Sequence, residues 1–269
     1  MNQVGGTLLE ATGVGVEIGG KTILERVDMT LSSGELVAVV GPNGAGKSTF
    51  ARVTCGLQKP TAGRIGWGGR PIDRIRGREL ARTRAFIPQR PQVPAGMTVE
   101  DAVAIGRSSH FGPFRGSSSD DRDAIAEAIG KAGVDRLAGR LLTTLSGGEL
   151  QRVQIAVALA QDSPALVADE PTAQLDLGAT ADVSRLLRGL VDQGLAVLLI
   201  VHDLALAAAI ADRVIVISSG RSIATGSPFE VLKPQLISEV WGVEADLISR
   251  DGRSALHVGW LDRRSEEVD

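Results

Sequence analysis

The sequence predicts an α/β fold built on a mostly parallel sheet. Four compact apolar runs have the length and composition of strands buried on both faces, at residues 36–40, 165–168, 195–201 and 213–217. Segments typical of helices separate these runs, as the crossover connections of a parallel sheet require. The stretch 7–31 instead shows short strand-like segments joined by a glycine turn, which predicts an N-terminal antiparallel β subdomain.

Between about residues 90 and 162 the pattern changes to helices and chain breaks. Ile125 and Ile129 lie four residues apart, as on one face of a helix, and 150–160 also has helical periodicity. We therefore expect an inserted α-helical subdomain. The parts predicted for a single domain over 1–269 are a core with the β subdomain at 1–88 and 163–235, the helical subdomain at 89–162, and a C-terminal extension at 236–269.

Composition restricts the function classes. The 33 glycines exceed the roughly 19 expected at an average of about 7% and predict many tight turns. A net charge of -3 argues against nucleic-acid binding. A single cysteine, Cys55, excludes an intramolecular disulfide and is typical of a reducing cytosol. We see no signal peptide, and His202 and Asp203 interrupt the longest apolar stretch, so a membrane role would require a partner.

A glycine-rich loop follows the first buried-type strand directly. Its pattern, Gly-x-x-x-x-Gly-Lys-Ser, lets the backbone curl so that N–H groups and a helix N-terminus face a phosphate. Lys47 would reach the β- and γ-phosphates of a nucleotide, and the Ser48 hydroxyl would bind Mg²⁺. The predicted ATP-binding residues of this loop are Gly41, Pro42, Asn43, Gly44, Ala45, Gly46, Lys47, Ser48 and Thr49.

Two further segments add chemistry. The apolar run at 165–168 ends in Asp169 and Glu170, where an acid can bind Mg²⁺ and its neighbour can polarise the attacking water. Ser146 and Glu149 have the capping-box spacing, and Gly147-Gly148 between them would leave bare N–H groups for an anion. From these residues alone, the second segment is equally a well-capped helix start.

In this order, the loop at 41–49, the segment 145–149, the pair at 169–170 and His202 resemble an ATP-binding-cassette (ABC) transporter ATPase subunit over residues 7–248. The resemblance implies ATP hydrolysis with Mg²⁺ and catalytic roles for Lys47, Gln89, Glu170 and His202. Mg²⁺ would be bound by Ser48, Gln89 and Asp169. The same resemblance implies that Ser146, Gly147 and Gly148 bind the γ-phosphate held by a second copy, and that Asp176, also a predicted ATP-site residue, belongs to the loop that crosses the dimer interface.

The implied assembly is a head-to-tail homodimer bound to integral membrane permease subunits at the cytoplasmic face of the membrane, served indirectly by a solute-binding protein. Segments 98–101, 104–107, 110–113 and 226–232 are similar to importers of iron chelates, haem and cobalamin. One departure is Ile18, which occupies the place where the family usually stacks an aromatic residue on adenine. Ala168 is another, because a bulkier apolar residue is usual before the aspartate.

Other functions remain open at this stage. Importers of other substrates, such as zinc or manganese, share much of the pattern, and a cluster-assembly ATPase of similar length is a non-transport alternative. A nucleotide-binding regulator without turnover is a third alternative, against which Glu170 and His202 argue.

Overall fold

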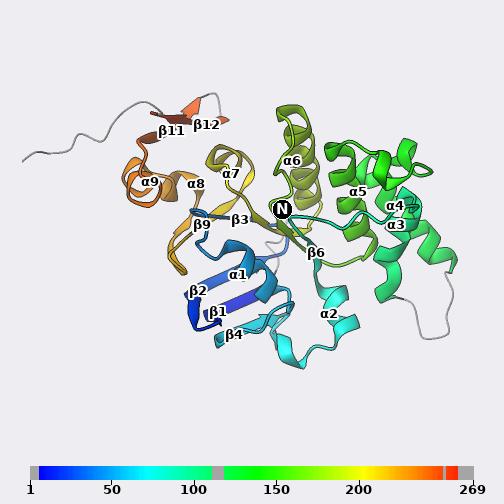
Figure 1. Ribbon diagram of the computed structural model, residues 1–269, viewed down its shortest axis with the longest axis horizontal. Coiled ribbons are helices and arrows are strands. Elements are labelled where there is room, and N and C mark those ends of the chain that lie inside the picture. The colour runs from blue at the N-terminus through cyan, green and yellow to red at the C-terminus, as the bar shows by residue number, and fades with distance from the viewer. Residues whose placement is uncertain (1–5, 111–117, 251–252, 260–269) are drawn as a thin grey trace, which may run out of the picture.

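The computed structural model describes residues 6–110, 118–250 and 253–259, and Figure 1 shows their arrangement. Ten strands of these ranges form one sheet in the order β5-β4-β1-β2-β10-β9-β3-β8-β7-β6. A separate hairpin pairs β11 (Ala245–Arg250) with β12 (Arg253–Val258). The sequence-based prediction of an α/β fold with an antiparallel start and a parallel core is confirmed.

The parallel part of the sheet is the centre of the molecule. Its strands are β9 (Arg213–Ser218), β3 (Leu36–Val40), β8 (Ala196–Ile200), β7 (Ala165–Asp169) and β6 (Ala85–Ile87). Every residue of β3, β7 and β8 is buried, which explains why these segments read as continuous apolar runs. The other strands are β1 (Thr7–Ile18), β2 (Lys21–Ser32), β4 (Ala62–Trp67), β5 (Arg70–Pro71) and β10 (Arg221–Gly226). They pair antiparallel, except that β10 pairs with β2 in parallel.

Helices cover the two faces of the parallel strands unequally. Val37 and Val39 of β3 point into a core shared with the antiparallel strands and with Phe50 of α1 (Lys47–Thr54). Ala38 and Val40 point into the opposite core, which is covered by α6 (Leu177–Asp192), α7 (Leu204–Ile210), α8 (Pro228–Val231) and α9 (Pro234–Trp241). In Figure 1, α1 accordingly lies below the sheet and α6 and α7 lie above it.

The segment between β6 and β7 is helical and has a core of its own. It contains α3 (Val99–Gly106), α4 (Ser119–Ala132) and α5 (Gly147–Ala160), with short 3₁₀ turns at Arg107–Ser109, Asp135–Leu137 and Leu142–Thr144. Val99, Val103 and Val153 are fully buried among these helices. A further 3₁₀ turn, Ile72–Arg74, and α2 (Gly77–Thr83) connect β5 to β6. The predicted boundaries of the helical subdomain and of the C-terminal extension stay predictions.

A buried ion pair closes one end of this helical region. The guanidinium of Arg107 lies 3.2 Å from the Asp121 carboxylate, and both side chains are almost fully enclosed. Hydrogen bonds from Ser118, the N-cap of α4, are the main cause that lowers the pKa of Asp121 to about 2, and Arg107 lowers it further. The similarity that we drew for residues 110–113 falls mostly outside the described residues.

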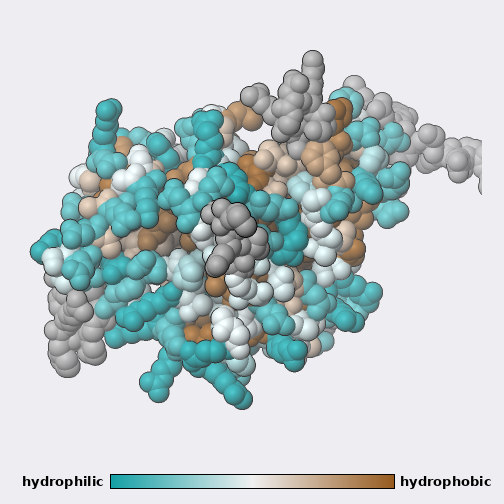
Figure 2. Space-filling model, turned by 180° about the vertical axis from the view of Figure 1, so that it is seen from behind, coloured by the Kyte–Doolittle hydropathy of each residue, from teal (hydrophilic) through white to brown (hydrophobic). Residues whose placement is uncertain are grey.

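Hydrophilic side chains predominate on the face of the molecule seen in Figure 2. Among the described residues, we find no helix with the length and apolar character needed to cross a membrane. The C-terminal hairpin contacts α7, and Leu247 and Leu256 pack against the core on that side.

Gly106 at the end of α3 allows a close approach to α5 and provides a test of this fold. A Cβ at Gly106 would lie 2.2 Å from the carbonyl oxygen of Val157, too close for any side chain. We expect Gly106→Ala to destabilise the protein by about 1–3 kcal/mol through overpacking. Thermal denaturation measures this effect. Gly130→Ala is the matched control at an exposed helical site, where a Cβ would lie in ordinary contact, 3.7 Å from Oδ1 of Asp135, and it should match or exceed the wild-type stability. Equal stability of the two variants would contradict the close approach.

Candidate functional site

Three polar side chains follow neighbouring strands of the parallel sheet. Gln89 comes after β6, Glu170 directly after β7, and His202 shortly after β8. The strands are adjacent and parallel, so their carboxyl ends meet at one edge of the sheet. There the Glu170 carboxylate accepts a hydrogen bond from the Gln89 amide and contacts Nε2 of His202.

Glu170 is held in an unusual backbone conformation. Its φ of 52° lies in the left-handed region that residues with a side chain seldom occupy, at a cost of about 1–3 kcal/mol. Its N–H donates to the carbonyl oxygen of Ile200 at 3.0 Å, which continues the pairing of β7 with β8 by one residue. Such strain is concentrated at functional sites, where the surrounding structure fixes the direction of a side chain.

The glycine-rich loop occupies the end of β3. Close approach fixes Gly41, because a Cβ there would lie 1.9 Å from the carbonyl oxygen of Ile217 on β9. Gly46, the N-cap of α1, has a φ of 100°, and a Cβ there would lie 2.5 Å from Cδ2 of Leu24. Glycine is therefore required at both positions for the loop to turn from the strand into the helix.

Lys47 lies folded against this loop. Its Nζ donates to the carbonyl oxygens of Gly41 and Pro42 at 2.8 and 2.9 Å, and the residue is buried. Burial lowers the pKa of Lys47, whereas the nearby carboxylates of Glu170 and Asp169 act in the opposite direction. The ammonium group thus places a positive charge beside the two acids of the site.

Ser48 and Asp169 form a pair of hard oxygen donors. The Ser48 hydroxyl lies 2.9 Å from Oδ1 of Asp169, at the start of α1 and the end of β7. Burial raises the pKa of Asp169, and the hydrogen bond from Ser48 partly offsets this effect. Mg²⁺ typically takes one or two protein oxygen ligands together with phosphate oxygens and water, and this pair fits that requirement. Within the described residues, no cluster of three or more His, Cys, Asp or Glu side chains offers an all-protein cage.

The Ser146 segment lies on a different part of the molecule. Ser146 caps α5 and forms the predicted capping box, in which its N–H donates to Glu149 at 2.8 Å and its hydroxyl accepts from the Glu149 N–H at 3.3 Å. The backbone N–H of Ser146 and then its hydroxyl, both acting on the Glu149 carboxylate, are the main causes that lower the pKa of Glu149. Gly147 and Gly148 form the first turn of α5 and do not precede it, so the helix begins earlier than residue 150. Figure 1 shows α5 among the helices at one end of the molecule, apart from α1.

Asp176 lies between these two regions. It caps α6 by accepting from the N–H of Ala179 at 2.7 Å. The next residue, Leu177, is 90% exposed, an unusual exposure for a leucine. Beside it is a cavity of about 230 Å³ that is also lined by Glu170 and His202. Asp176 and Leu177 therefore lie at the rim of the site.

One positioning residue was missed in the sequence. Asp203 accepts from the N–H groups of Ala205 and Leu206 and so caps α7 directly after His202, which fixes where the strand ends. In the sequence, an aspartate directly before an apolar helical run indicates such a cap. Ile18 is half-exposed at the end of β1. Its place at the position that stacks on adenine stays a prediction.

The structure thus brings together one group of predicted residues and separates another. Lys47, Ser48, Gln89, Asp169, Glu170 and His202 converge on the carboxyl edge of the sheet. Ser146, Gly147 and Gly148 belong to the helical end. A single chain therefore has a glycine-rich loop beside two acids and, elsewhere, a capped helix start with two glycines, whose binding of an anion stays a prediction.

Comparison with known proteins decides the family. Residues 24–173 match the family model described as ABC transporter. The chain is 44% identical over 238 residues to the hemin import ATP-binding protein HmuV of Nocardia farcinica, covering 87% of this chain and 82% of that protein. This chain belongs to the ABC transporter family.

Other relatives and solved structures agree with this assignment of an ABC ATPase. The iron(3+)-hydroxamate import ATP-binding protein FhuC of Bacillus subtilis is 33% identical, with 88% of each chain covered. A putative metal-chelate type ABC transporter in an inward-facing conformation has a TM-score of 0.82 at 25% identity, covering 94% of this chain and 97% of that one. The dimeric ABC cassette MJ0796 has a TM-score of 0.71 at 27% identity, covering 82% and 99%. As a member of the family, the protein binds ATP and hydrolyses it.

The phosphate loop of this ABC ATPase can be tested through Lys47. We expect Lys47→Ala to weaken ATP binding by about 10- to 150-fold, because a hydrogen bond to a charged group contributes about 1.5–3 kcal/mol. Titration with a fluorescent ATP analogue measures this loss. Lys59→Ala removes an exposed lysine shortly after α1 and serves as the control. Unchanged affinity in Lys47→Ala would contradict the assigned role.

Proposed function

We propose that this protein is the ATPase subunit of an importer that takes up haem through a membrane permease. The observation that carries the proposal is the 44% identity to a hemin import ATP-binding protein over 87% of the chain. Hemin import proteins of Rhodococcus jostii and Streptomyces coelicolor, at 40% and 41% identity, support the same cargo. A ferric hydroxamate is the second candidate cargo, because FhuC of Bacillus subtilis is 33% identical.

In the proposed site, the loop from Gly41 to Thr49 binds the phosphates of ATP. Lys47 supplies positive charge to the β- and γ-phosphates, and the oxygens of Ser48, Asp169 and Gln89 would hold Mg²⁺, which neutralises phosphate charge when bound. The contact of Gln89 with Glu170 supports its place beside the metal ligands.

Glu170 and His202 would act on water and the γ-phosphate. Glu170 accepts a hydrogen bond from the attacking water and increases its nucleophilicity, as a positioned carboxylate does. His202 contacts the same carboxylate and lies with its side chain 43% exposed toward the open edge of the sheet. The histidine therefore orients the carboxylate on one side and reaches the γ-phosphate on the other.

The separated Ser146 segment supports a dimeric site. We propose that Ser146, Gly147 and Gly148 bind the γ-phosphate held by a second copy of the chain, with Asp176 crossing between the copies. Two chains arranged head to tail about a two-fold axis would bury two ATP molecules, a closed isologous arrangement. The similarity to the dimeric cassette MJ0796 supports this arrangement. The dimer would lie at the cytoplasmic face of the membrane against two permease subunits and act indirectly on a solute-binding protein.

Glu170→Gln tests the catalytic and dimeric parts of the proposal. We expect ATP hydrolysis to fall by at least about 100-fold, because a general base contributes about 10²–10⁴-fold. The variant should form an ATP-dependent dimer, since binding remains and turnover does not. Size-exclusion chromatography with light scattering at saturating ATP and Mg²⁺ measures this. Glu239→Gln, at an exposed site on α9, is the matched control. A Glu170→Gln variant that stays monomeric would contradict the head-to-tail arrangement.

The cargo requires a separate experiment on the assembled transporter. We expect proteoliposomes that contain this subunit with the permease encoded beside it to accumulate haem when ATP is present. A ferric hydroxamate serves as the competing cargo, and Glu170→Gln should abolish uptake of either. Uptake of the hydroxamate alone would reassign the cargo. Copurification with cluster-assembly proteins, in a genome that encodes no neighbouring permease, would overturn the importer function.

A further inference from the structure

Positive charge is concentrated in one part of the chain. Residues 36–99 contain eleven lysines and arginines and only two acids, Asp73 and Glu79, although the whole chain has a net charge of -3. The other acidic residues all lie outside this part. A separation of charge of this kind produces a local field opposite in sign to the net charge, and it is typical of proteins that bind nucleic acids or membrane surfaces.

Two of these arginines stabilise the fold. The guanidinium of Arg84 donates to the carbonyl oxygen of Cys55 at 3.1 Å, and that of Arg82 donates to the carbonyl oxygen of Ser109 at 3.0 and 3.2 Å. The acceptors lie directly after α1 and in the turn that follows α3. Arg82 and Arg84 are therefore engaged within the protein.

Three other arginines of this segment face the solvent. This group, the arginine patch, consists of Arg74 in the 3₁₀ turn, Arg76 at the N-cap of α2, and Arg78 in its first turn. Within the parts of the chain that the structure describes, none of the three forms an ion pair. Glu79 pairs with Arg70, whose hydrogen bond is the main cause that lowers the pKa of Glu79, and Arg76 contributes less. Asp73 offsets one of the three charges, so the patch stays cationic.

The backbone beneath the arginine patch is fixed to the core. Ile75 and Leu80 are buried in the core shared with the antiparallel strands, and Ile72 packs against it. Gly56, shortly after α1, lies against this segment, because a Cβ there would be 3.1 Å from the side chains of Ile72 and Leu80. The patch is therefore presented on an ordered surface, and binding requires little ordering of the backbone.

An exposed apolar side chain accompanies the arginine patch. Leu57 directly follows Gly56 and is 59% exposed, and Lys59 two residues later is an exposed cation. In Figure 1, α1 and α2 lie on the same side of the sheet, and hydrophilic side chains extend from the same lower edge of the molecule in Figure 2. Basic residues together with an exposed apolar side chain are typical of proteins that bind at a membrane interface.

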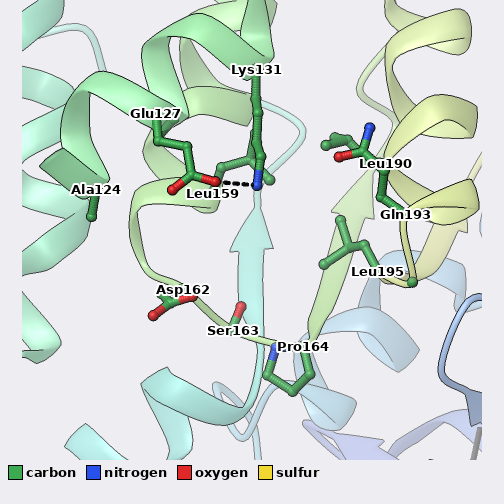
Figure 3. A pocket seen from close by; sticks show the side chains of 12 residues that line it. Ala124, Glu127, Lys131, Leu159, Asp162, Ser163, Pro164, Leu190, Gln193 and Leu195 are labelled. Atoms are coloured by element: carbon green, nitrogen blue, oxygen red, sulfur yellow. Dashed lines mark ion pairs between the residues drawn. The ribbon is translucent and has the colours of Figure 1, made fainter.

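At the helical end of the molecule, charges of opposite sign pair instead. Glu127 and Lys131 of α4 lie 2.7 Å apart beside a cavity of about 300 Å³, and Figure 3 shows the two side chains meeting. At physiological ionic strength the Debye length is about 8 Å, so acidic residues on distant parts of the surface do not cancel the field of the arginine patch. The patch can therefore attract an anionic surface although the chain as a whole is negative.

We propose that the arginine patch binds the anionic headgroups at the surface of a lipid bilayer. The guanidinium groups would donate hydrogen bonds to phosphate oxygens, with the planar geometry that arginine offers. Lys59 adds attraction without a fixed geometry, and Leu57 enters between the headgroups. None of these residues belongs to the proposed ATP site, so this contact with lipid is independent of the cargo and of hydrolysis.

Nucleic acid fits the same charges less well. A site for single strands requires aromatic side chains on which bases stack, and neither the arginine patch nor residues 57–59 include one. A duplex would be bound through its phosphates alone, which leaves Leu57 in water. A bilayer surface satisfies both the cations and Leu57.

Cosedimentation of the purified full chain with lipid vesicles tests the proposal. We expect binding to vesicles of equimolar phosphatidylcholine and phosphatidylglycerol, and none to vesicles of phosphatidylcholine alone. The R74Q/R76Q/R78Q variant should have a partition coefficient lower by about 100-fold, because each cation near such a surface contributes about fivefold. The matched control, R122Q/R136Q/R185Q, removes the same charge from exposed sites elsewhere and should bind as the wild type does. Equal binding by R74Q/R76Q/R78Q and the wild type overturns the proposal.

Leu57 provides a second measurement that leaves the arginine patch intact. Leu57→Cys would carry an environment-sensitive fluorophore, since native Cys55 is fully buried and burial raises the pKa of its thiol to about 12. We expect a blue shift of the emission on addition of the anionic vesicles. The shift should reverse at an ionic strength of about 1 M, where the Debye length falls to about 3 Å. Emission that does not change on vesicle addition, or a shift that persists at this ionic strength, contradicts binding through the patch.

A duplex oligonucleotide separates the two kinds of polyanion. If the wild type binds the duplex and not the anionic vesicles, and R74Q/R76Q/R78Q binds neither, the lipid proposal is overturned and the patch is reassigned to nucleic acid. Neither result bears on the ATP site, because Lys47→Ala and Glu170→Gln test that site without lipid.

Discussion

The site depends on one geometric constraint, the shared direction of β3, β8, β7 and β6. Because these strands are parallel and adjacent, everything that follows their carboxyl ends is delivered to a single edge. Glu170 is the point where this constraint acts most directly, since it contacts Gln89 from one neighbouring strand and His202 from the other. The complete burial of β3, β7 and β8 keeps that edge in place.

The same topology separates the polar side chains at the sheet edge from the Ser146 segment on the inserted helices. The strand ends provide the amide of Gln89, the two carboxylates and the imidazole of His202, and the start of α1 provides the Lys47 ammonium group and the Ser48 hydroxyl. The inserted helices have their own apolar core, but Ile155 and Ala158 of α5 are buried together with Ala85 and Ile87 of β6. Hydrogen bonds from Gln161 and Arg82 also join these helices to the α2–β6 segment. The polar side chains of the proposed reaction therefore lie on the strand ends and α1, whereas Ser146 lies on the inserted helices.

Much of this arrangement could be predicted from the sequence because the signals are local. The burial of the central strands appears in the sequence as continuous apolar runs. The glycines at positions 41 and 46 belong to the loop pattern in the sequence, and the structure leaves no room for a Cβ at either position. Capping of α5 by Ser146 and Glu149 depends on residues three apart and was predicted, although the helix starts within the Gly147-Gly148 pair.

Other features could not be predicted because they depend on residues distant in sequence. The contact between Gln89 and Glu170 joins positions 81 residues apart, and only the family resemblance indicated the role of Gln89. The bonds of Gln161 to Ala81 and Arg84 have no sequence signal, since a glutamine after a helix is ordinary. Likewise, neither the left-handed backbone of Glu170 nor the exposure of Leu177 can be read from residue type.

In the proposed dimer, burial of Leu177 would make the association of two copies depend on temperature. Its side chain is 90% exposed in the single chain, at the rim of a cavity next to Asp176. Withdrawing such a side chain from water is favourable by about 1.5–3 kcal/mol, is driven by entropy near room temperature and carries a negative heat-capacity change. In the proposed head-to-tail dimer, an isologous interface that covers Leu177 would contain it twice. Association of the ATP-bound copies would therefore weaken on cooling, even where the phosphate contacts are unchanged.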